Sequence, residues 1–158
     1  MKIKGIIFED FINYKKPCMT IEMPYCDFKC DRECGERVCQ NSALAAAADI
    51  EIEMDSIIKQ YKTNDIPQAI VFQGLEPFDS WHDLFYLIKR FRDKNIQDTI
   101  VIYTGYTEEE LTNQLTYLKQ YENIIVKFGR FIPNQESHYD KILGVNLASN
   151  NQYAKKIS

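Results

Sequence analysis

The sequence predicts an α/β protein with a mostly parallel sheet, and two observations lead to that prediction. Short, continuously apolar segments, which are typical of strands buried on both faces, occur at residues 69–72, 99–103 and 124–128. The stretches between them carry apolar residues at helical spacing, which indicates helices that connect the strands. We therefore expect parallel strands joined by right-handed crossovers, with functional loops at the carboxyl ends of the strands.

The N-terminal part is expected to contribute two strands and two helices. Residues 2–8 are expected to pair at an edge of the sheet, and residues 18–23 to form the strand that leads into a cysteine loop. An alanine-rich helix is expected to begin near Ser42 and to include residues 45–48. A second helix is expected over residues 54–62, with three apolar side chains on one face, those of Ile57, Ile58 and Tyr61.

Two further helices are expected between the buried strands of the C-terminal part. Large apolar side chains recur at helical spacing over residues 80–94. Thr107 followed by Glu110 forms a capping-box pattern, which predicts that another helix opens there. The tail from Pro133 is polar and weakly patterned, so no element is predicted in it. Because no linker or repeat interrupts the chain, we expect a single domain over residues 1–158.

Composition and charge narrow the class of function. The chain has 158 residues, of which 45% are hydrophobic, and this is enough for one compact core. Its formal net charge is −4 and no basic run could follow a phosphate backbone, so nucleic-acid binding is not expected. The sequence has no signal-peptide pattern and no apolar stretch of about 20 residues, so we expect no membrane association and a cytoplasmic location.

All five cysteines lie in the first quarter of the chain, which points to metal or redox chemistry. Cys26, Cys30, Cys34 and Cys39 follow one another closely, whereas a disulfide framework would need an oxidising compartment. Three thiolates on an iron–sulfur cluster leave one iron open for a substrate, whereas four thiolates close a zinc site. The spacing alone is compatible with both a cluster and a zinc knuckle. Cys18 is expected to be a small, buried hydrophobic residue of its strand.

Five motifs in the same order give the chain a resemblance to a known family. Cys26-Asp27-Phe28-Lys29-Cys30, followed by Cys39-Gln40-Asn41, resembles the cysteine motif of the radical S-adenosylmethionine (SAM) superfamily. Over nearly the whole chain, the sequence is similar to the activating proteins of anaerobic ribonucleotide reductase, which are small glycyl-radical activases. The other four motifs are F-Q-G-L-E-P at residues 72–77, Y-T-G-Y-T-E-E-E-L at 103–111, G-R-F-I at 129–132 and N-N-Q at 150–152.

The resemblance implies a fold, an activity and partners. The fold would be a partial (β/α) barrel, a small radical-SAM core with a mostly parallel sheet. The activity would be the reductive cleavage of S-adenosylmethionine with a [4Fe-4S] cluster, which yields a deoxyadenosyl radical. This radical would abstract hydrogen from a glycine of anaerobic ribonucleotide reductase, a large glycyl-radical enzyme. An electron donor such as flavodoxin or ferredoxin would reduce the cluster.

The resemblance also implies which residues bind the two cofactors, with no catalytic residue beyond the cluster ligands. Cys26, Cys30 and Cys39 would hold the cluster, with Cys34 as the alternative third ligand. Glu76 would oppose the positive charge of the methionine amino group. Further contacts with S-adenosylmethionine would come from the cysteine loop and from the ends of two buried strands, namely from Phe28, Gly74, Pro77, Tyr103, Thr104 and Gly105.

The chain departs from the family pattern at three places. Eight residues separate Cys30 from Cys39 where the family has two, which is an insertion of six. With Cys34 as the ligand the spacing would be three residues, but the Asn that follows the motif would be lost, so Cys39 is favoured. Leu75 replaces one glycine of a glycine pair, and Lys127-Phe128 stands where the family usually has an acidic residue.

Other interpretations of the sequence stay open beside this one. The same radical chemistry could act on another protein or on a small molecule. Alternatively, the cysteine loop could be a structural zinc site in a non-enzymatic module. Arg130 follows a predicted strand alone, so it is expected to be a surface salt-bridge partner.

Overall fold

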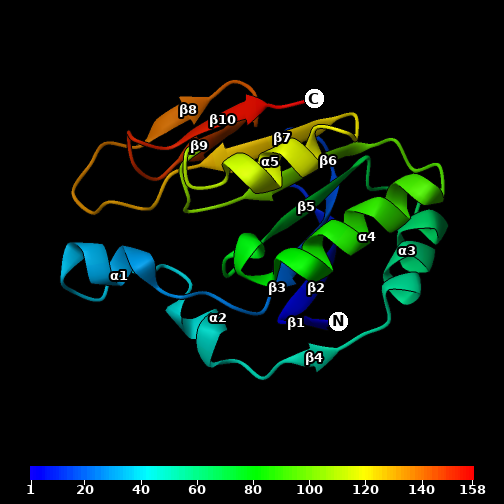
Figure 1. Cartoon of the computed structure of the whole chain (residues 1–158), viewed down its shortest axis with the longest axis horizontal. Coiled ribbons are helices and arrows are strands. Elements are labelled where there is room, and N and C mark those ends of the chain that lie inside the picture. The colour runs from blue at the N-terminus through cyan, green and yellow to red at the C-terminus, as the bar shows by residue number, and fades with distance from the viewer.

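The main sheet has six strands in the order β10-β7-β6-β5-β3-β2 (Figure 1). The computed structural model describes residues 1–158. The four central strands run parallel and are β3 (Cys18–Met23), β5 (Ala69–Gly74), β6 (Thr99–Tyr103) and β7 (Ile124–Phe128). The edge strands β2 (Gly5–Asp10) and β10 (Tyr153–Lys156) run antiparallel to their neighbours. The architecture is therefore mixed α/β with a mostly parallel sheet, and closure into a partial (β/α) barrel stays a prediction.

Three helices cover one face of this sheet, namely α3 (Met54–Thr63), α4 (Trp81–Asp93) and α5 (Thr112–Leu118). Figure 1 shows α4 and α5 in front of the strands. The apolar side chains of these helices pack with Phe72 and Ile102 of the strands in one core. A short 3₁₀ helix, η1 (Pro77–Ser80), leads from β5 into α4. None of the helices combines the length and the apolar character that crossing a membrane requires.

A thinner layer without helices covers the other face of the sheet. Val71, Val101 and Ile125 belong to this face, and they share a cluster with Leu143 and Leu147. Leu147 lies in β9 (Val145–Leu147), which pairs with β8 (His138–Asp140). Because successive side chains of a strand point to opposite faces, the two clusters together explain why the central strands are apolar throughout.

Residues 26–46, here called the cysteine segment, lie beside the sheet and not over it. It contains α1 (Lys29–Cys34) and α2 (Ser42–Ala46), which follow β3. Figure 1 shows both helices at the left of the molecule, on the opposite side from α3. Neither helix has a fully buried residue, so hydrophobic packing alone does not fix the position of this segment.

Three segments, besides the turn at residues 108–111, differ from the expectation. Residues 2–8 are divided between two sheets, because β1 (Lys2–Ile3) pairs with β4 (Ile50–Glu51) and only β2 joins the main sheet. The helix expected up to residue 48 ends at Ala46, because Ala47 is extended. The tail from Pro133 contains three strands, and the pattern of β10 is weak because Ala154 is its only buried residue.

The capping box at Thr107 forms, but it closes a turn and does not open a helix. The Thr107 amide donates to the Glu110 carboxylate at 2.9 Å, and the Glu110 amide donates to the Thr107 hydroxyl at 3.4 Å. Residues 108–111 form a turn, and α5 begins only at Thr112. The carboxylate of Glu110 also binds Lys29 and Arg130, which lie outside this turn.

The helix-covered core predicts a large effect of truncating Phe72. This side chain is completely buried, so Phe72→Ala should lower the free energy of unfolding by about 3–5 kcal/mol. Phe11→Ala is the matched control, because Phe11 is 64% exposed and its truncation should change stability by less than about 0.5 kcal/mol. Urea unfolding followed by circular dichroism measures both values, and equal losses would contradict the assigned core.

Candidate functional site

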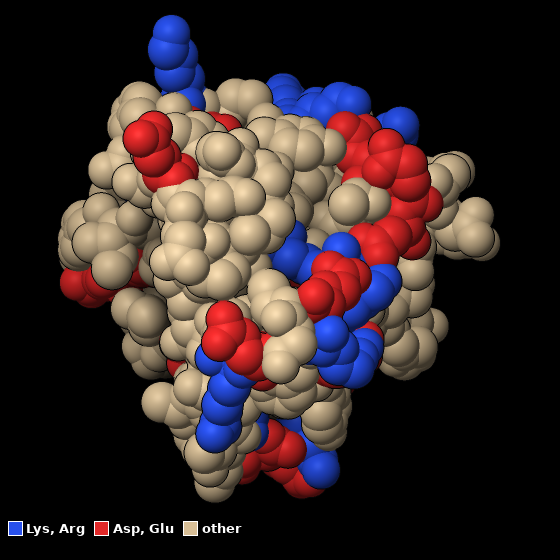
Figure 2. Space-filling model, turned by 90° about the vertical axis from the view of Figure 1, so that its left-hand side faces the viewer, with Lys and Arg blue, Asp and Glu red and all other residues tan.

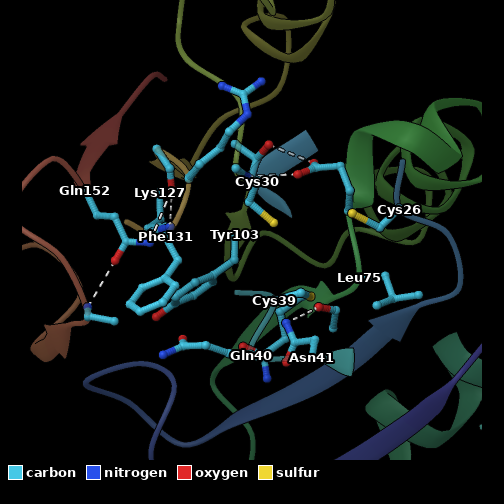
Figure 3. A pocket seen from close by; sticks show the side chains of 18 of the residues that line it. Cys26, Cys30, Cys39, Gln40, Asn41, Leu75, Tyr103, Lys127, Phe131 and Gln152 are labelled. Atoms are coloured by element: carbon cyan, nitrogen blue, oxygen red, sulfur yellow. Dashed lines mark hydrogen bonds between the residues drawn. The ribbon is translucent and has the colours of Figure 1, made fainter. Parts of the chain in front are cut away.

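A pocket of about 390 Å³ lies at the carboxyl ends of the parallel strands. It is lined by the ends of β3, β5, β6 and β7, by the cysteine segment and by residues 129–131 and 146–148. Figure 3 shows Cys26, Cys30 and Cys39 on one side of the pocket and Lys127, Phe131 and Gln152 on the other. The volume lies within the range of about 300–1,000 Å³ that is typical of small-molecule sites.

The floor of the pocket is a row of four polar side chains across the sheet. Glu22 pairs with Gln73 in the strand register, and Tyr103 pairs with Lys127. Gln73, Tyr103 and Lys127 each come two residues after an apolar residue of the helix-free face, so they belong to the same face. All four line the pocket, so this face changes from apolar to polar where the strands end.

Sequence reasoning missed Glu22, Gln73 and Lys127 as pocket residues. Their positions in the strands are visible in the sequence, but the register that aligns them is not. A change from apolar to polar residues at every second position near the end of a strand is the signal that could have found them.

The carboxyl group of Glu76 connects the ends of β5 and β6. Its Oε1 accepts hydrogen bonds from the Thr104 hydroxyl at 2.7 Å and from the Phe78 amide at 3.1 Å. Its Oε2 accepts from the Gly105 amide at 2.8 Å. Burial raises the pKa of the Glu76 carboxyl group to about 7, although these hydrogen bonds oppose the rise. A carboxylate has about four acceptor positions, so one remains for a donor in the pocket.

The three residues at the end of β6 that were predicted to contact a ligand also make contacts within the chain. The Thr104 hydroxyl donates to Glu76 and accepts from the Tyr106 amide, so it is engaged within the chain. A Cβ at residue 105 would lie only 3.3 Å from Cγ of Arg130. Glycine at this position therefore allows the Arg130 side chain to approach closely. The Tyr103 hydroxyl donates to the Asn13 carbonyl at 2.6 Å, and all three residues line the pocket.

Lys127 brings an ammonium group into the same pocket. It is 7% exposed, and burial lowers the pKa of its amino group to about 8, while the negative charge of Glu76 opposes this change. Nζ donates a hydrogen bond to the Gly129 carbonyl at 2.8 Å. Because an ammonium group has three donors, Lys127 can also bind an anionic group of a ligand.

Three of the four clustered cysteines line the pocket. They are Cys26, Cys30 and Cys39, whereas Cys34 is not among the lining residues. Burial raises the pKa of the Cys26 thiol to about 12, and it also raises the pKa of Cys30. The positive charge of a bound metal would favour the thiolate forms of these residues.

The cysteine sulfurs do not converge on a point that suits a single ion. Zinc with Zn–S bonds of about 2.3 Å would hold its sulfurs about 3.8 Å apart. The only group of three side chains with metal-binding atoms within 4.8 Å of one another consists of Cys26, Asp27 and Asp79. Three thiols spread around one pocket match the donors of an iron–sulfur cluster better, because such a cluster is larger than one ion and is held by thiolates.

Ion pairs attach the cysteine segment to the ends of β6 and β7. The carboxylate of Glu110 binds Lys29, which lies between two of the cysteines, and it binds Arg130 at 2.7 Å. The Arg130 side chain is 13% exposed and also reaches Glu33, so it is a partly buried ion-pair partner and not the exposed one expected. Figure 2 views the molecule from this side and shows acidic and basic side chains next to each other.

Tyr106 stands at the centre of these charges. Lys29 and Arg130 both lie over its ring, at 5.6 and 5.4 Å from the centroid. Its hydroxyl donates to Asp79 at 2.7 Å, and Asp79 accepts from the Asp27 amide at 2.8 Å. The cysteine segment is thus held at both Asp27 and Lys29.

A contact between Asn41 and Gly74 attaches the cysteine segment to the end of β5. Asn41 Nδ2 donates to the Gly74 carbonyl at 2.6 Å. Gly74 has a φ of 89°, and a Cβ there would lie 3.0 Å from the backbone of Glu22 and 3.1 Å from the side chain of Leu44. Glycine is therefore required at residue 74 for the close contact of β3, β5 and α2.

The side of the pocket opposite the cysteines is formed by the G-R-F and N-N-Q motifs, which hydrogen bonds hold together. Gln152 accepts from the amides of Ala148 and Ser149 and donates to the Gly129 carbonyl at 3.2 Å. Asn151 donates to the Arg130 carbonyl at 2.8 Å. Motifs that are distant in the sequence thus form one side of the pocket.

Three residues singled out in the sequence lie outside the pocket lining. Phe28 precedes α1 in a left-handed conformation, and its amide donates to Cys26 Sγ at 3.3 Å. Pro77 is buried at the start of η1. Cys18 is completely buried in the helix-free core cluster. A direct contact of Phe28 or Pro77 with a cofactor therefore stays a prediction, whereas the buried position expected for Cys18 is confirmed.

The raised pKa of Glu76 predicts a pH dependence of stability. Between the ordinary value of 4.5 and about 7, the folded protein keeps a proton that the unfolded chain has lost. The contribution of Glu76 to the free energy of unfolding therefore falls as pH rises through this range. Denaturant titrations at several pH values should show a flatter profile for Glu76→Gln than for the wild type, and parallel profiles would contradict the burial of a titrating carboxyl group.

The ion pairs of Glu110 predict that this residue restrains the cysteine segment. Glu110→Gln should weaken the attachment by about 1 kcal/mol, and trypsin should then cleave at the exposed Arg32 and Arg37 about fivefold faster. Glu109→Gln is the matched control, because Glu109 is exposed in the same turn and forms no ion pair with Lys29 or Arg130. Equal cleavage rates for the two variants would argue against the restraint.

Comparison with known proteins identifies the family. The family model of the 4Fe-4S single cluster domain matches residues 18–153, which include all five cysteines. No curated protein and no solved structure matches the chain. The matched region covers most of the chain, and it favours an iron–sulfur cluster over the zinc knuckle that the spacing had left open. The chain therefore belongs to the 4Fe-4S single cluster domain family and is an iron–sulfur protein.

Proposed function

We propose that the protein is a radical S-adenosylmethionine enzyme in which Cys26, Cys30 and Cys39 hold the [4Fe-4S] cluster. The observation that carries the proposal is that these three cysteines, and not four, share one pocket of small-molecule size. Three protein ligands leave one iron open, which is the arrangement that substrate binding at a cluster requires. A cluster that only carries electrons normally has four cysteine ligands.

The polar groups of the pocket suit the charges of S-adenosylmethionine. Glu76 has one acceptor position left for the amino group, and a bound cation favours the ionised carboxylate. Lys127 offers donors for an anionic group. Glu22 and Gln73 add further polar contacts on the floor. A ligand with an amino acid at one end and a polar nucleoside at the other matches this lining.

The chain itself binds, orients and shields the reactants. Cys26, Cys30 and Cys39 would hold the cluster, which would supply one electron for the cleavage of S-adenosylmethionine to methionine and a deoxyadenosyl radical. Phe131 and Leu147 line the pocket and limit the access of water to the reacting atoms. Glu76 holds the amino end in place through its fixed position between β5 and β6.

The proposed target of the radical is a glycine of anaerobic ribonucleotide reductase. This part rests on the resemblance of five motifs to the activating proteins of that enzyme. Two of those motifs, G-R-F-I and N-N-Q, are joined by hydrogen bonds at the pocket wall. The electron is proposed to come from a flavodoxin or a ferredoxin. Another protein or a small molecule is the alternative target of the same chemistry.

The ligand set predicts different effects for two cysteine variants. After anaerobic reconstitution and reduction, the wild type should release methionine from S-adenosylmethionine. Cys39→Ala should abolish this release, because the loss of a thiolate destabilises the cluster. Cys34→Ala is the matched control and should keep most of the activity, because Cys34 lies outside the pocket lining. Full activity of Cys39→Ala, or loss of activity only in Cys34→Ala, would overturn the assignment.

The same assay tests the class of function. A wild-type protein that holds its cluster but never releases methionine would not be a radical S-adenosylmethionine enzyme. An excess of the large reductase, added with the cofactors, should acquire a glycyl radical that electron paramagnetic resonance detects. Methionine release without that radical would favour another target.

A further inference from the structure

We propose that Asp31 is a positioning residue that closes the inserted cysteine loop and thereby presents Cys39 to the pocket. The inference rests on the proposed ligand set and deepens it, because it explains how two cysteines with eight residues between them can share a cluster. The Cys30 thiol also donates a hydrogen bond to Oδ1 of Asp31 at 3.9 Å, but the proposed role of Asp31 is to position the loop and not to bind the cluster or S-adenosylmethionine.

Two hydrogen bonds carry this proposal. Oδ1 of Asp31 accepts from the Val38 amide at 2.9 Å and from the Cys39 amide at 2.8 Å. Asp31 directly follows Cys30, so these bonds bring residue 39 back beside residue 30. Bonds from backbone amides to a carboxylate are charge-assisted and stronger than neutral ones. One side chain therefore fixes the start and the end of the loop.

The local backbone supports the same closure. Gly35 ends α1 with a φ of 71°, a left-handed conformation that turns the chain back. No atom lies within 4 Å of the position that a Cβ at Gly35 would occupy, so backbone conformation is the reason for glycine there. The turn and the hydrogen bonds of Asp31 together fold residues 31–38 into a closed loop.

Cys34 is the competing ligand that the closed loop excludes. It lies one helical turn after Cys30 in α1, which corresponds to about 6 Å along the helix axis. Cys30 lines the pocket and Cys34 does not, so α1 carries Cys34 away from the pocket edge. The closed loop thus favours Cys39 over Cys34 as the third ligand of the cluster.

The first experiment compares substitutions at Asp31 by cluster retention. The proteins are reconstituted anaerobically with iron and sulfide, and the loss of iron to a chelator is followed by visible absorption. Asp31→Ala should lose iron about 10–100-fold faster than the wild type, as expected when a residue that orients metal ligands is removed. Asp31→Asn keeps the Oδ1 acceptor and should restore most of the retention. Glu36→Ala is the matched control, because Glu36 is an exposed acid of the same loop that takes no part in the two hydrogen bonds.

The second experiment removes the insertion itself. Deletion of residues 33–38 leaves Cys30-Asp31-Arg32-Cys39, in which two residues separate the cysteines and no long loop needs closing. This shortened protein should retain its cluster, and Asp31→Ala should have no further effect in it. The comparison separates loop closure from any direct effect of the aspartate charge on the cluster.

The results overturn the proposal in two cases. One is wild-type iron retention by Asp31→Ala in the full-length loop, and the other is an equal loss caused by Asp31→Ala in the shortened loop. Far-ultraviolet circular dichroism of the apoproteins identifies a variant that fails to fold, and the Asn variant then decides alone. Because iron retention needs no S-adenosylmethionine, a wild type that holds iron but releases no methionine would refute the proposed function and leave the role of Asp31 intact.

Discussion

The buried carboxyl group of Glu76 is the interaction on which the pocket depends. Parallel strands end at the same edge of the sheet, but the backbone amides at these ends have no partners within the sheet. Glu76 satisfies the Gly105 amide after β6 and the Phe78 amide at the start of η1, and it takes the Thr104 hydroxyl as well. One side chain therefore holds two neighbouring strand ends at a fixed separation. Burial raises the pKa of this carboxyl group, and the three donors offset part of the unfavourable free energy of burying it.

The cysteine segment is held by a different kind of force from the sheet. The strands are fixed by hydrophobic clusters on both faces, whereas α1 and α2 have no fully buried residue. Lys29, Asp27 and Asn41 attach the segment by an ion pair and by hydrogen bonds to the sheet edge. Polar attachments are weaker in water than a packed core, so the segment can open locally while the sheet stays folded. Such a division suits a site that must accept an inorganic cluster after the chain has folded.

The fold could be predicted from the sequence further than the site. The strand at residues 99–103 and the helix α3 follow directly from apolar patterns, because hydrophobic burial creates those patterns. Strand β10 could not be predicted, since an antiparallel edge strand with one buried residue has no clear period. At the site, the positions of Cys26, Glu76 and Tyr103 were expected from motifs, whereas the pairing of Tyr103 with Lys127 depends on a register that no local pattern encodes. Thr104 lines the pocket as expected, but the bond from its hydroxyl to Glu76 joins two strand ends and has no signal in the sequence, and its contact with a ligand stays a prediction.

The hydrogen bond that Gln152 donates to the Gly129 carbonyl completes the pocket wall with a residue that is synthesised late. Gln152 and β10 complete a wall whose other half is β7, yet the ribosome makes them long after the cysteines of residues 26–39. A nascent chain therefore carries its thiols outside the ribosome before the enclosing wall exists, and during that interval they are open to oxidation. The pocket therefore encloses its cysteines only after nearly the whole chain has been synthesised.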